Sequence, residues 1–393
     1  IGQTLPTGTA WNLLWEWRQT DSDTSRADHF GRIGLELRQP LLRNFGPAFQ
    51  LAGIEIAVRN AELSAQQFAE AAMDVAAEVE RGFWSLVQAQ LDYAVQEELL
   101  ERSRRRLTDN RERVRIGARN VDATDLAQNE ADVASREERL LAAADEIDRR
   151  RLALLRLVNP EGRSAYWRLK VATVAPDLDP ARLPAPPEED ASIAAALAAR
   201  PEIRQVRLGV AVNDLRLRQA RNQLLPQLDL VLDYGPTGRG RDLGRSLGSV
   251  WDFRHNGVDL SLQGSYPLGN RAADGRRLAA ELTRDQSRLS AEDVEQRVEL
   301  EVLDALRGVS ISAKRWRAAL VTLEKTARKL ELAEEAVRLG KLGFSEFNIL
   351  QFQDELTAAR LSVNQNYADY LRSRTALLRA EGRILSARGL TVE

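Results

Sequence analysis

Four short stretches of the chain alternate between apolar and polar residues. Their apolar positions lie two residues apart, in the segments 11–18, 33–38, 227–234 and 258–266. Because successive side chains of a β-strand point to opposite faces, this pattern predicts strands with one apolar and one polar face. We therefore expect two strand pairs, the first within 8–40 and the second formed by 226–235 and 256–267.

The alternation fits either a half-buried sheet of a soluble protein or the wall of an outer-membrane barrel. Trp11, Trp15 and Trp17 share the apolar face of one strand, and Tyr234 and Tyr266 lie at apolar positions of the later strands. No other segment offers these strands a core, and lipid-facing aromatic residues are typical of outer-membrane strands. We therefore predict that these five aromatic side chains face outer-membrane lipid.

The number of strands constrains the assembly. Four strands are too few to close a membrane barrel, for which about eight is the smallest number. Two copies of the chain would enclose only enough room for their own side chains, whereas three copies leave a water-filled lumen. If the polar faces line a conduit, a homotrimer is the smallest assembly that fits.

The hydrophobic pattern also predicts two very long helices. Along 48–115, mostly apolar residues recur at alternating steps of four and three, which specifies a coiled-coil seam. A helix of this length extends about 100 Å. The same pattern covers 271–339.

Each long helix should turn at a short tip and pair antiparallel with a returning helix. The expected tips and returning helices are 116–123 with 124–158, and 340–345 with 345–385. Taken alone, such helices also suit a periplasmic coiled-coil adaptor or structural protein without a pore. The attached strand pairs favour a channel over that alternative.

The two halves of the chain repeat the same order of landmarks. His29, Pro40 and Gly117 recur as His255, Pro267 and Gly340, each about 225 positions later. We therefore expect a first repeat over 1–158, a proline-rich linker over 159–190 and a second repeat over 191–393. The second repeat opens with a helix at 193–224 that the first lacks, so we expect a matching helix to precede Ile1 in the full gene product.

Composition narrows the function further. The net charge of −2 gives no electrostatic reason to expect nucleic acid as a partner. The chain has no cysteine and only two histidines, which argues against a metal site, and no phosphate loop or nucleophile motif is present. Carboxylates alternate with arginine on the helices as solvated faces do. We therefore expect no catalysis and no cofactor.

Several short motifs resemble those of the TolC-type outer-membrane efflux protein family, in the same order over essentially the whole chain. The stretch LRQPLLRNFG at 37–46 resembles that family's junction between strand and helix, and RPEI at 200–203 resembles the start of its second repeat. The stretch LLPQL at 224–228 is similar to its entry from helix to strand. The order and spacing carry the resemblance, because each motif alone is short.

The resemblance implies a mainly α fold with membrane β-structure. A duplicated unit of a β-hairpin and a long coiled-coil helical hairpin would form a trimeric 12-stranded β-barrel, continued by an α-helical barrel. The chain would then be an outer-membrane channel subunit of a tripartite efflux or type I secretion system. It would lie in the bacterial outer membrane, extend into the periplasm, and serve as a passive export conduit that is gated at its periplasmic tips.

The resemblance also assigns roles to the tips. In the family, these turns dock a periplasmic adaptor (membrane-fusion) protein and, through it, an inner-membrane pump. The matching residues here are Ile116, Gly117, Ala118, Leu339, Gly340 and Lys341. Both glycines would equally suit ordinary helix C-caps, and the two interpretations are compatible.

Gate residues follow from the same resemblance. Thr124 and Asp125 resemble a pair that helps hold the tips closed, although Asp125 also suits a plain charge at a helix N-terminus. Asn348 and Gln351 occupy positions where family members often carry carboxylates that form an acidic constriction. Asp354 lies within about a turn and could substitute for them.

Overall fold

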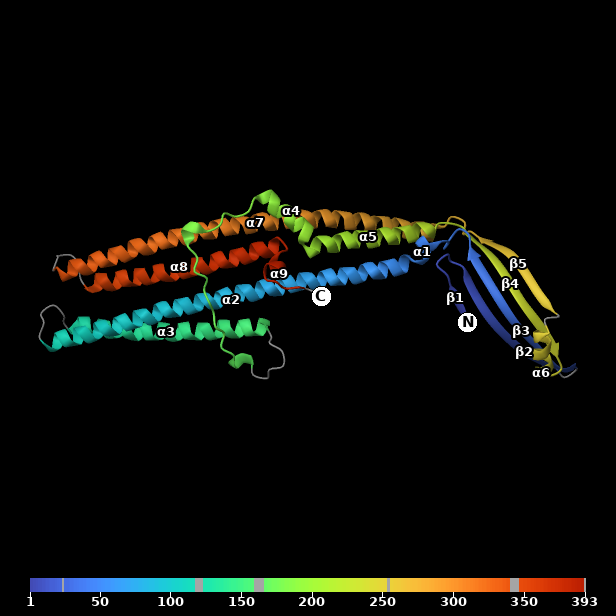
Figure 1. The fold of residues 1–393 in the computed structure, drawn as a ribbon, viewed down its shortest axis with the longest axis horizontal. Helices are drawn as coiled ribbons and strands as arrows, with labels where there is room; N and C mark the ends of the chain where they lie inside the picture. Colours follow the sequence, from blue (N-terminus) through green and yellow to red (C-terminus); the bar gives the residue numbers. More distant parts are fainter. Residues whose placement is uncertain (23–24, 117–122, 159–165, 253–254, 340–345, 392–393) are drawn as a thin grey trace. The chain divides into compact units, whose positions relative to one another are not determined.

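The computed structural model describes residues 1–22, 25–116, 123–158, 166–252, 255–339 and 346–391. The chain folds into long helices and one antiparallel sheet (Figure 1). It divides into two compact units. One, here called the strand unit, comprises Ile1–Gln67 and Glu202–Val294, and the other, the helical unit, comprises Phe68–Pro201 and Glu295–Glu393.

The sheet of the strand unit has five strands in sequence order. They are β1 (Gly2–Thr4), β2 (Ala10–Ser22), β3 (Ser25–Pro40), β4 (Gln227–Gly240) and β5 (Asn256–Ser265). Every neighbouring pair is antiparallel. Both strand pairs expected from the alternation are present, and β3 pairs with β4 to join the two repeats into one sheet.

The strands differ from the predicted pattern in three respects. A short fifth strand, β1, pairs with β2, which the alternation could not reveal because three residues are too few to show a period. Strand β4 continues five residues beyond the predicted end at 235, to Gly240, because backbone pairing with β3 does not depend on apolar side chains. The segment between β4 and β5 contains a helix, α6 (Leu243–Trp251), whose N-cap Asp242 accepts a hydrogen bond from the backbone of Arg245 at 2.9 Å.

Left-handed backbone marks both junctions between strand and helix. Asn44 and Gly46 have positive φ before α1 (Pro47–Gln50), and Gly269 and Asn270 have positive φ before α7 (Arg271–Arg338). Glycine and asparagine tolerate this conformation best. The predicted single helix over 48–115 is therefore a short α1 followed, after Leu51, by α2 (Ala52–Arg115).

The predicted helix over 193–224 is also two helices. Helix α4 (Glu189–Ala199) ends at Arg200, whose extended backbone (φ −69°, ψ 129°) precedes Pro201, and α5 (Pro201–Asn222) follows. A residue before proline avoids the helical region, and proline cannot donate a backbone hydrogen bond. The sequence motif at 200–203 thus marks a break between helices rather than a continuous run.

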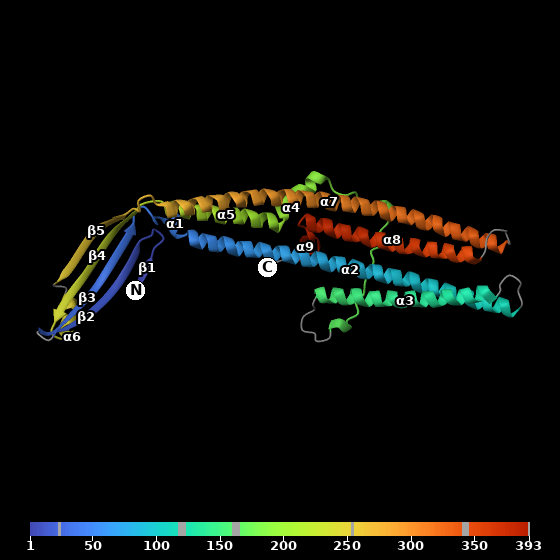
Figure 2. The same ribbon diagram turned by 180° about the vertical axis from the view of Figure 1, so that it is seen from behind.

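The helical unit contains the returning helices. They are α3 (Ala123–Val158) and α8 (Glu346–Ala380), followed by the short α9 (Ile384–Ala387) (Figures 1 and 2). Helix α8 ends before the predicted 385 because Gly382 adopts a left-handed conformation (φ 72°) that terminates the helix. Among the described residues, no helix is both long and apolar enough to span a membrane.

Burial along the long helices is uneven. Leu86, Leu100 and Leu107 of the predicted α2 seam are buried, but Ile54 and Phe68 near its start are 63% and 61% exposed. In the second hairpin, the indole ring of Trp316 on α7 lies 5.0 Å from the ring of Tyr367 and 5.8 Å from that of Tyr370. A heptad pattern predicts which residues would face a partner helix, but it does not tell where along the helix that partner lies.

Candidate functional site

The register of the sheet places all four apolar patterns on one side. Trp15 lies opposite Ile33 on β3, Leu35 lies opposite Tyr234 on β4, and Tyr234 lies opposite Val258 on β5. Directly paired residues, and residues two apart on one strand, share a face. The sheet therefore has one apolar face that is continuous across both repeats.

This apolar face is largely exposed. Trp15 is 72% exposed, Val258 69% and Trp17 44%, with Tyr234 at 36%. A contiguous exposed patch of large apolar side chains marks an interaction surface. Of the predicted lipid-facing residues, Trp11 is only half-buried, and Tyr266 is exposed but lies one position beyond the end of β5.

The opposite face carries a ladder of charges. Glu36, Asp233 and Asp259 lie in one cross-strand row, where like charges would repel each other. Arg32 forms an ion pair with Asp233, and a guanidinium nitrogen of Arg38 lies 3.2 Å from Glu36. Both arginines lie on β3 on the same face as Glu36, four residues before it and two residues after it, so they compensate the charge of the acidic row. Period-two alternation predicted a polar face, but the individual pairs require the register.

Both long edges of the sheet have unpaired backbone among the described residues. Strand β1 covers only Ala10, Trp11 and Asn12 of β2, and β5 pairs with β4 alone. A long exposed edge with an apolar face is a template for pairing with another strand. The sheet is thus incomplete as an isolated unit in both its edges and its apolar face.

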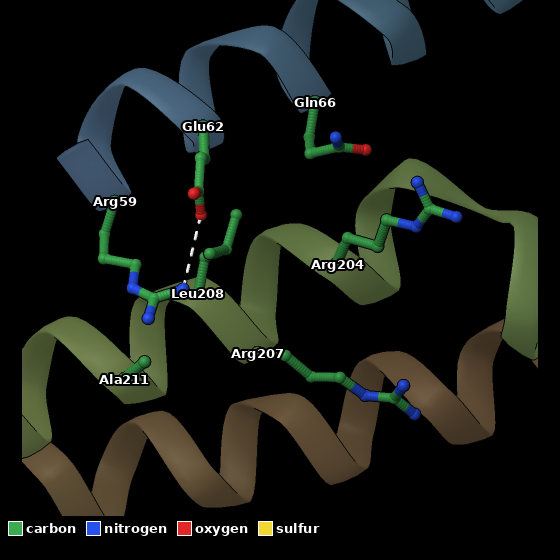
Figure 3. Close-up of a pocket in the computed structure, with 7 residues that line it drawn as sticks. All are labelled: Arg59, Glu62, Gln66, Arg204, Arg207, Leu208 and Ala211. Atoms are coloured by element: carbon green, nitrogen blue, oxygen red, sulfur yellow. Dashed lines mark hydrogen bonds and ion pairs between the residues drawn. The ribbon is translucent and has the colours of Figure 1, made fainter.

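A groove of about 410 Å³ lies in the strand unit between α2 and α5 (Figure 3). Arg59 and Glu62 of α2 form an ion pair at 3.4 Å, while Arg204 and Arg207 project from α5 (Figure 3). All four side chains are exposed or nearly so, and exposed pairs of this kind contribute little. The groove has no arrangement of nucleophile and base that would suggest catalysis.

The predicted gate residues fall at the end of the helical unit that carries the tips. Thr124 and Asp125 open α3, while Asn348 and Gln351 lie on the first turns of α8. Ile116 and Leu339, which precede the two tips, are 67% and 59% exposed. The predicted docking residues Gly117, Ala118, Gly340 and Lys341 lie outside the described residues.

Helices α3 and α8 face each other across a groove of about 680 Å³ near this end. Its lining includes Asp132 of α3 and Gln351, Asp354 and Glu355 of α8. Gln351 is exposed and donates a long hydrogen bond of 3.5 Å to Glu355. Gln351 and Asp354 are neighbours on α8 by sequence, and the groove places these two predicted gate residues beside Asp132 of α3.

A buried arginine connects the two helices. Arg136 of α3 is 1% exposed; its Nε donates to Asp132 at 2.9 Å, and its Nη2 donates to Asp354 at 3.2 Å. Ser103 of α2 donates to the same oxygen of Asp132 at 2.6 Å. Asp354 therefore does not stand as an isolated carboxylate, because a cation buried in the other returning helix neutralises it.

Sequence reasoning missed Arg136, although a signal for it existed. Arg136 lies seven residues after Asn129, and both are buried on α3. On α2, the buried Gln96, Ser103 and Asn110 also lie seven residues apart. Polar residues that repeat at the heptad interval belong to the seam rather than to the surface, so this first hairpin has a polar seam near its tip.

The matching part of the second hairpin is apolar. Leu330 of α7 packs with Ile349 and Leu356 of α8, and Phe352 lies beside them. Among the described residues, Oε1 of Gln96 and Nδ2 of Asn110 in this polar seam are buried without a hydrogen-bond partner, which weakens the packing there. The two hairpins therefore differ in the polarity of their seams near the tips.

Three partly buried titratable groups of the helical unit have perturbed pKa values. Burial would raise the pKa of Glu80, but hydrogen bonds from Arg388, Thr375 and Trp84 outweigh it and hold that pKa below 4.5. Burial raises the pKa of Asp92 above its usual value, although hydrogen bonds from Asn364 and Gln88 oppose the shift. Burial likewise raises the pKa of Tyr367, whose hydroxyl donates to the carbonyl of Pro176. These groups lie on the packed helices and form no catalytic cluster.

Residues 192–383 of the chain match the protein family described as outer membrane efflux protein. A search of the curated proteins finds no match.

Solved structures with the same fold cover 96% of this chain. CusC is 17% identical to this chain, with a TM-score of 0.75 and 84% of its own length covered. The Campylobacter jejuni CmeC outer membrane channel is 16% identical, with a TM-score of 0.73 and 78% of its own length covered. The outer membrane protein VceC of Vibrio cholerae is 14% identical with 0.72 over 87% of its length. Together with the family match, these structures confirm the resemblance that the sequence motifs indicated.

Proposed function

We propose that this chain, a relative of the outer membrane efflux proteins by the match over residues 192–383 and by its fold, is one subunit of an outer-membrane export channel. The observation that carries the proposal is the two-faced sheet. One face presents Trp15, Val258 and their neighbours to the surroundings, and the other presents paired charges. Such a sheet suits a wall between lipid and water.

The strand lengths support four membrane strands for each subunit. Strands β2 to β5 have 13, 16, 14 and 10 residues, and a tilted membrane strand requires about 9–11. The three residues of β1 are too few to cross. Pairing the outer edge of β5 with that of β2 in the next copy closes the sheet, and three copies form a twelve-stranded barrel with room for a lumen.

The polar face then lines the lumen, and the long helices continue the conduit into the periplasm. Export is passive, because the chain supplies walls rather than chemistry. Ile116, Leu339 and the adjoining tip residues dock a periplasmic adaptor protein and, through it, an inner-membrane pump. The assembly then serves tripartite efflux or type I secretion, in the outer membrane and extending into the periplasm.

The gate lies where the tips begin. Thr124 and Asp125 of α3, with Asn348, Gln351 and Asp354 of α8, control its opening. Arg136 adds a connection that runs from the seam of the first hairpin to Asp354. Opening requires α3 and α8 to separate, which breaks this ion pair.

Detergent-solubilised protein tests the proposal directly. It should run as a trimer by mass measurement and conduct ions in planar bilayers. Asp125→Ala should raise the conductance, whereas Asp145→Ala, an exposed residue of the same helix that pairs with Arg149 at 3.2 Å, should leave it unchanged. A monodisperse monomer without conductance would refute the channel.

The competing function is a periplasmic coiled-coil adaptor or structural protein without a pore, which the long helices alone would suit. Such a protein would remain dissolved without detergent. The exposed apolar face predicts instead that the chain precipitates when detergent is withdrawn.

A further inference from the structure

Helix α6 lies on the apolar face of the sheet. It packs at the end of β3 and β4 away from α1 and α5, as Figures 1 and 2 both show. Gly31, one of its contacts, pairs with Trp17 on β2 and with Gly238 on β4, so it shares the face of those residues. The helix therefore covers a patch of the same surface that we assign to lipid.

Three glycines form the seat of this helix. A Cβ at Gly238 would lie 2.3 Å from the carbonyl oxygen of Ser246. A Cβ at Gly240 would lie 2.5 Å from the backbone nitrogen of Ser246. At Gly31 a Cβ would come within 3.2 Å of the Ser246 hydroxyl oxygen. Only residues without a side chain let the helix backbone approach this closely, so this part of the sheet is shaped to receive α6.

The contact is a fixed one. Ser246 is 0% exposed and Val250 1% exposed, and both point toward the seat. The Ser249 hydroxyl donates to the carbonyl of Ser246 at 2.9 Å and, over a longer 3.4 Å, to that of Arg239 on the strand. The helix is thus held by apolar packing and by satisfied hydroxyl groups.

Exposed aromatic and basic residues surround α6. Trp251 is 66% exposed at its C-terminal end, and Trp17 flanks the seat on β2. Arg241 and Arg245 are exposed where β4 leads into the helix, whereas Arg239 shares the polar face of the sheet with Asp233. Exposed tryptophan beside arginine is typical of segments that lie at the boundary between acyl chains and phosphate headgroups.

We propose that α6 is an interfacial anchor, which lies on the outer wall of the barrel and binds anionic lipid headgroups of the outer leaflet through Arg241 and Arg245. Trp251 enters the boundary between headgroups and acyl chains. This inference rests on the proposed function, since it needs the apolar face to meet lipid. The site lies at the end of the sheet opposite the helices, which places it in the leaflet away from the periplasm.

Spin labels on single cysteines test the anchor, because the chain contains no cysteine. Gly248→Cys puts the label on α6, where a Cβ meets nothing within 4 Å. Val258→Cys marks the lipid-facing sheet, and Gly275→Cys, equally open, marks an exposed helix position in the strand unit. Collision with oxygen reports lipid, and collision with a nickel chelate reports water.

The labelled protein is compared in phosphatidylcholine vesicles with and without about one third phosphatidylglycerol. We expect the label at 248 to lie between those at 258 and 275 in depth. Anionic lipid should lower its nickel accessibility at least about twofold, because each arginine near an anionic surface contributes roughly a fivefold preference. The double variant Arg241→Gln with Arg245→Gln should abolish that difference and leave the label at 258 unchanged.

A matched pair of glycine variants tests the contact between the sheet and α6. Gly238→Ala should displace α6 and expose the label at 248 to nickel, whereas Gly264→Ala, on the same face, has only ordinary contact with Leu228 at 3.7 Å and should not. The label at 258 reports whether the sheet of each variant remains in the bilayer.

The possible failures are distinguishable. A label at 258 in water overturns the channel itself. A label at 258 in lipid with the label at 248 as open to nickel as that at 275 overturns the anchor alone. Two further results would overturn headgroup binding and show that another surface covers α6. One is protection of the label at 248 from nickel that does not depend on anionic lipid. The other is spin–spin broadening between the 248 labels of neighbouring copies.

Discussion

Replacing Arg136 by methionine should cost the helical unit much of its stability near the tips. The arginine is 1% exposed and contacts two carboxylates, at 2.9 Å on Asp132 and 3.2 Å on Asp354. Methionine has a similar length but leaves Asp132 without its cation and Asp354 with only the more distant Arg139, at 3.9 Å. Removing one partner of a buried ion pair typically costs about 3–5 kcal/mol.

The actual cost should be smaller, because neither carboxylate is fully buried. The side chain of Asp132 is 21% exposed and keeps its hydrogen bond from Ser103, and that of Asp354 is 54% exposed. We therefore expect a loss of about 2–3 kcal/mol for Arg136→Met. The buried Nη1 of Arg136 has no hydrogen-bond partner, and removing it recovers part of the loss.

Double-mutant cycles separate the two contacts. The coupling free energy of Arg136 with Asp132 should be about 1–3 kcal/mol, whereas that with the half-exposed Asp354 should stay below about 1 kcal/mol. Urea unfolding of the detergent-solubilised variants, followed by far-UV circular dichroism, measures both. Arg139→Met is the matched control, since its 52% exposed side chain lies 3.9 Å from Asp354, and it should change stability by less than about 0.5 kcal/mol.

Two results would refute this reasoning. Equal stability of Arg136→Met and the wild type would mean that the buried cation contributes nothing. A coupling with Asp354 as large as that with Asp132 would mean that the contact between α3 and α8 is more shielded from water than its exposure indicates.

Further predictions concern the perturbed and unsatisfied groups of the helical unit. Because the pKa of Glu80 is lower in the folded state, ionised Glu80 stabilises the fold above its unfolded pKa, and this stabilisation is lost as pH falls through the folded pKa. Glu80→Gln should lower the free energy of unfolding by about 1–2 kcal/mol at pH 7. It should also weaken the fall of the melting temperature with decreasing pH on the acid side. Because the pKa of Asp92 is higher in the folded state, its contribution to stability is present at low pH and is lost as pH rises. The Asp92→Asn variant should therefore have a slightly higher melting temperature at pH 7, and a lower one would contradict this. Asn110→Leu removes a buried amide nitrogen that has no partner and should add about 1 kcal/mol in urea unfolding, whereas an unchanged midpoint would indicate that water reaches this seam.

The periodic patterns of the sequence determined the elements and their faces. The alternation around Trp15 and Tyr234 specifies an apolar and a polar side for each strand, because the side-chain period of a strand is two whatever its neighbours are. The heptad pattern likewise specified the long helices. The hydrophobic pattern did not predict all the ends of these helices. It continues past Pro201 and Gly382, although a helix ends just before each of these residues.

Only the tertiary structure decided which surfaces meet. The register between β3 and β4 joins the two repeats and brings Arg32 within reach of Asp233, a residue about 200 positions away in the chain. It also sets Gly31 beside Gly238 as a seat for α6, which no local pattern reveals because glycine carries no side chain to show a period.

Arg136 illustrates the same limit in the helical unit. Its heptad position indicates a seam, but its partner Asp354 lies on a helix of the other repeat, so the ion pair is invisible along either helix. Periodicity is a property of one segment and can be read from the sequence. Pairing between distant segments depends on the free energy of the whole fold, which is why the sheet register, the α6 seat and the buried arginine required the structure.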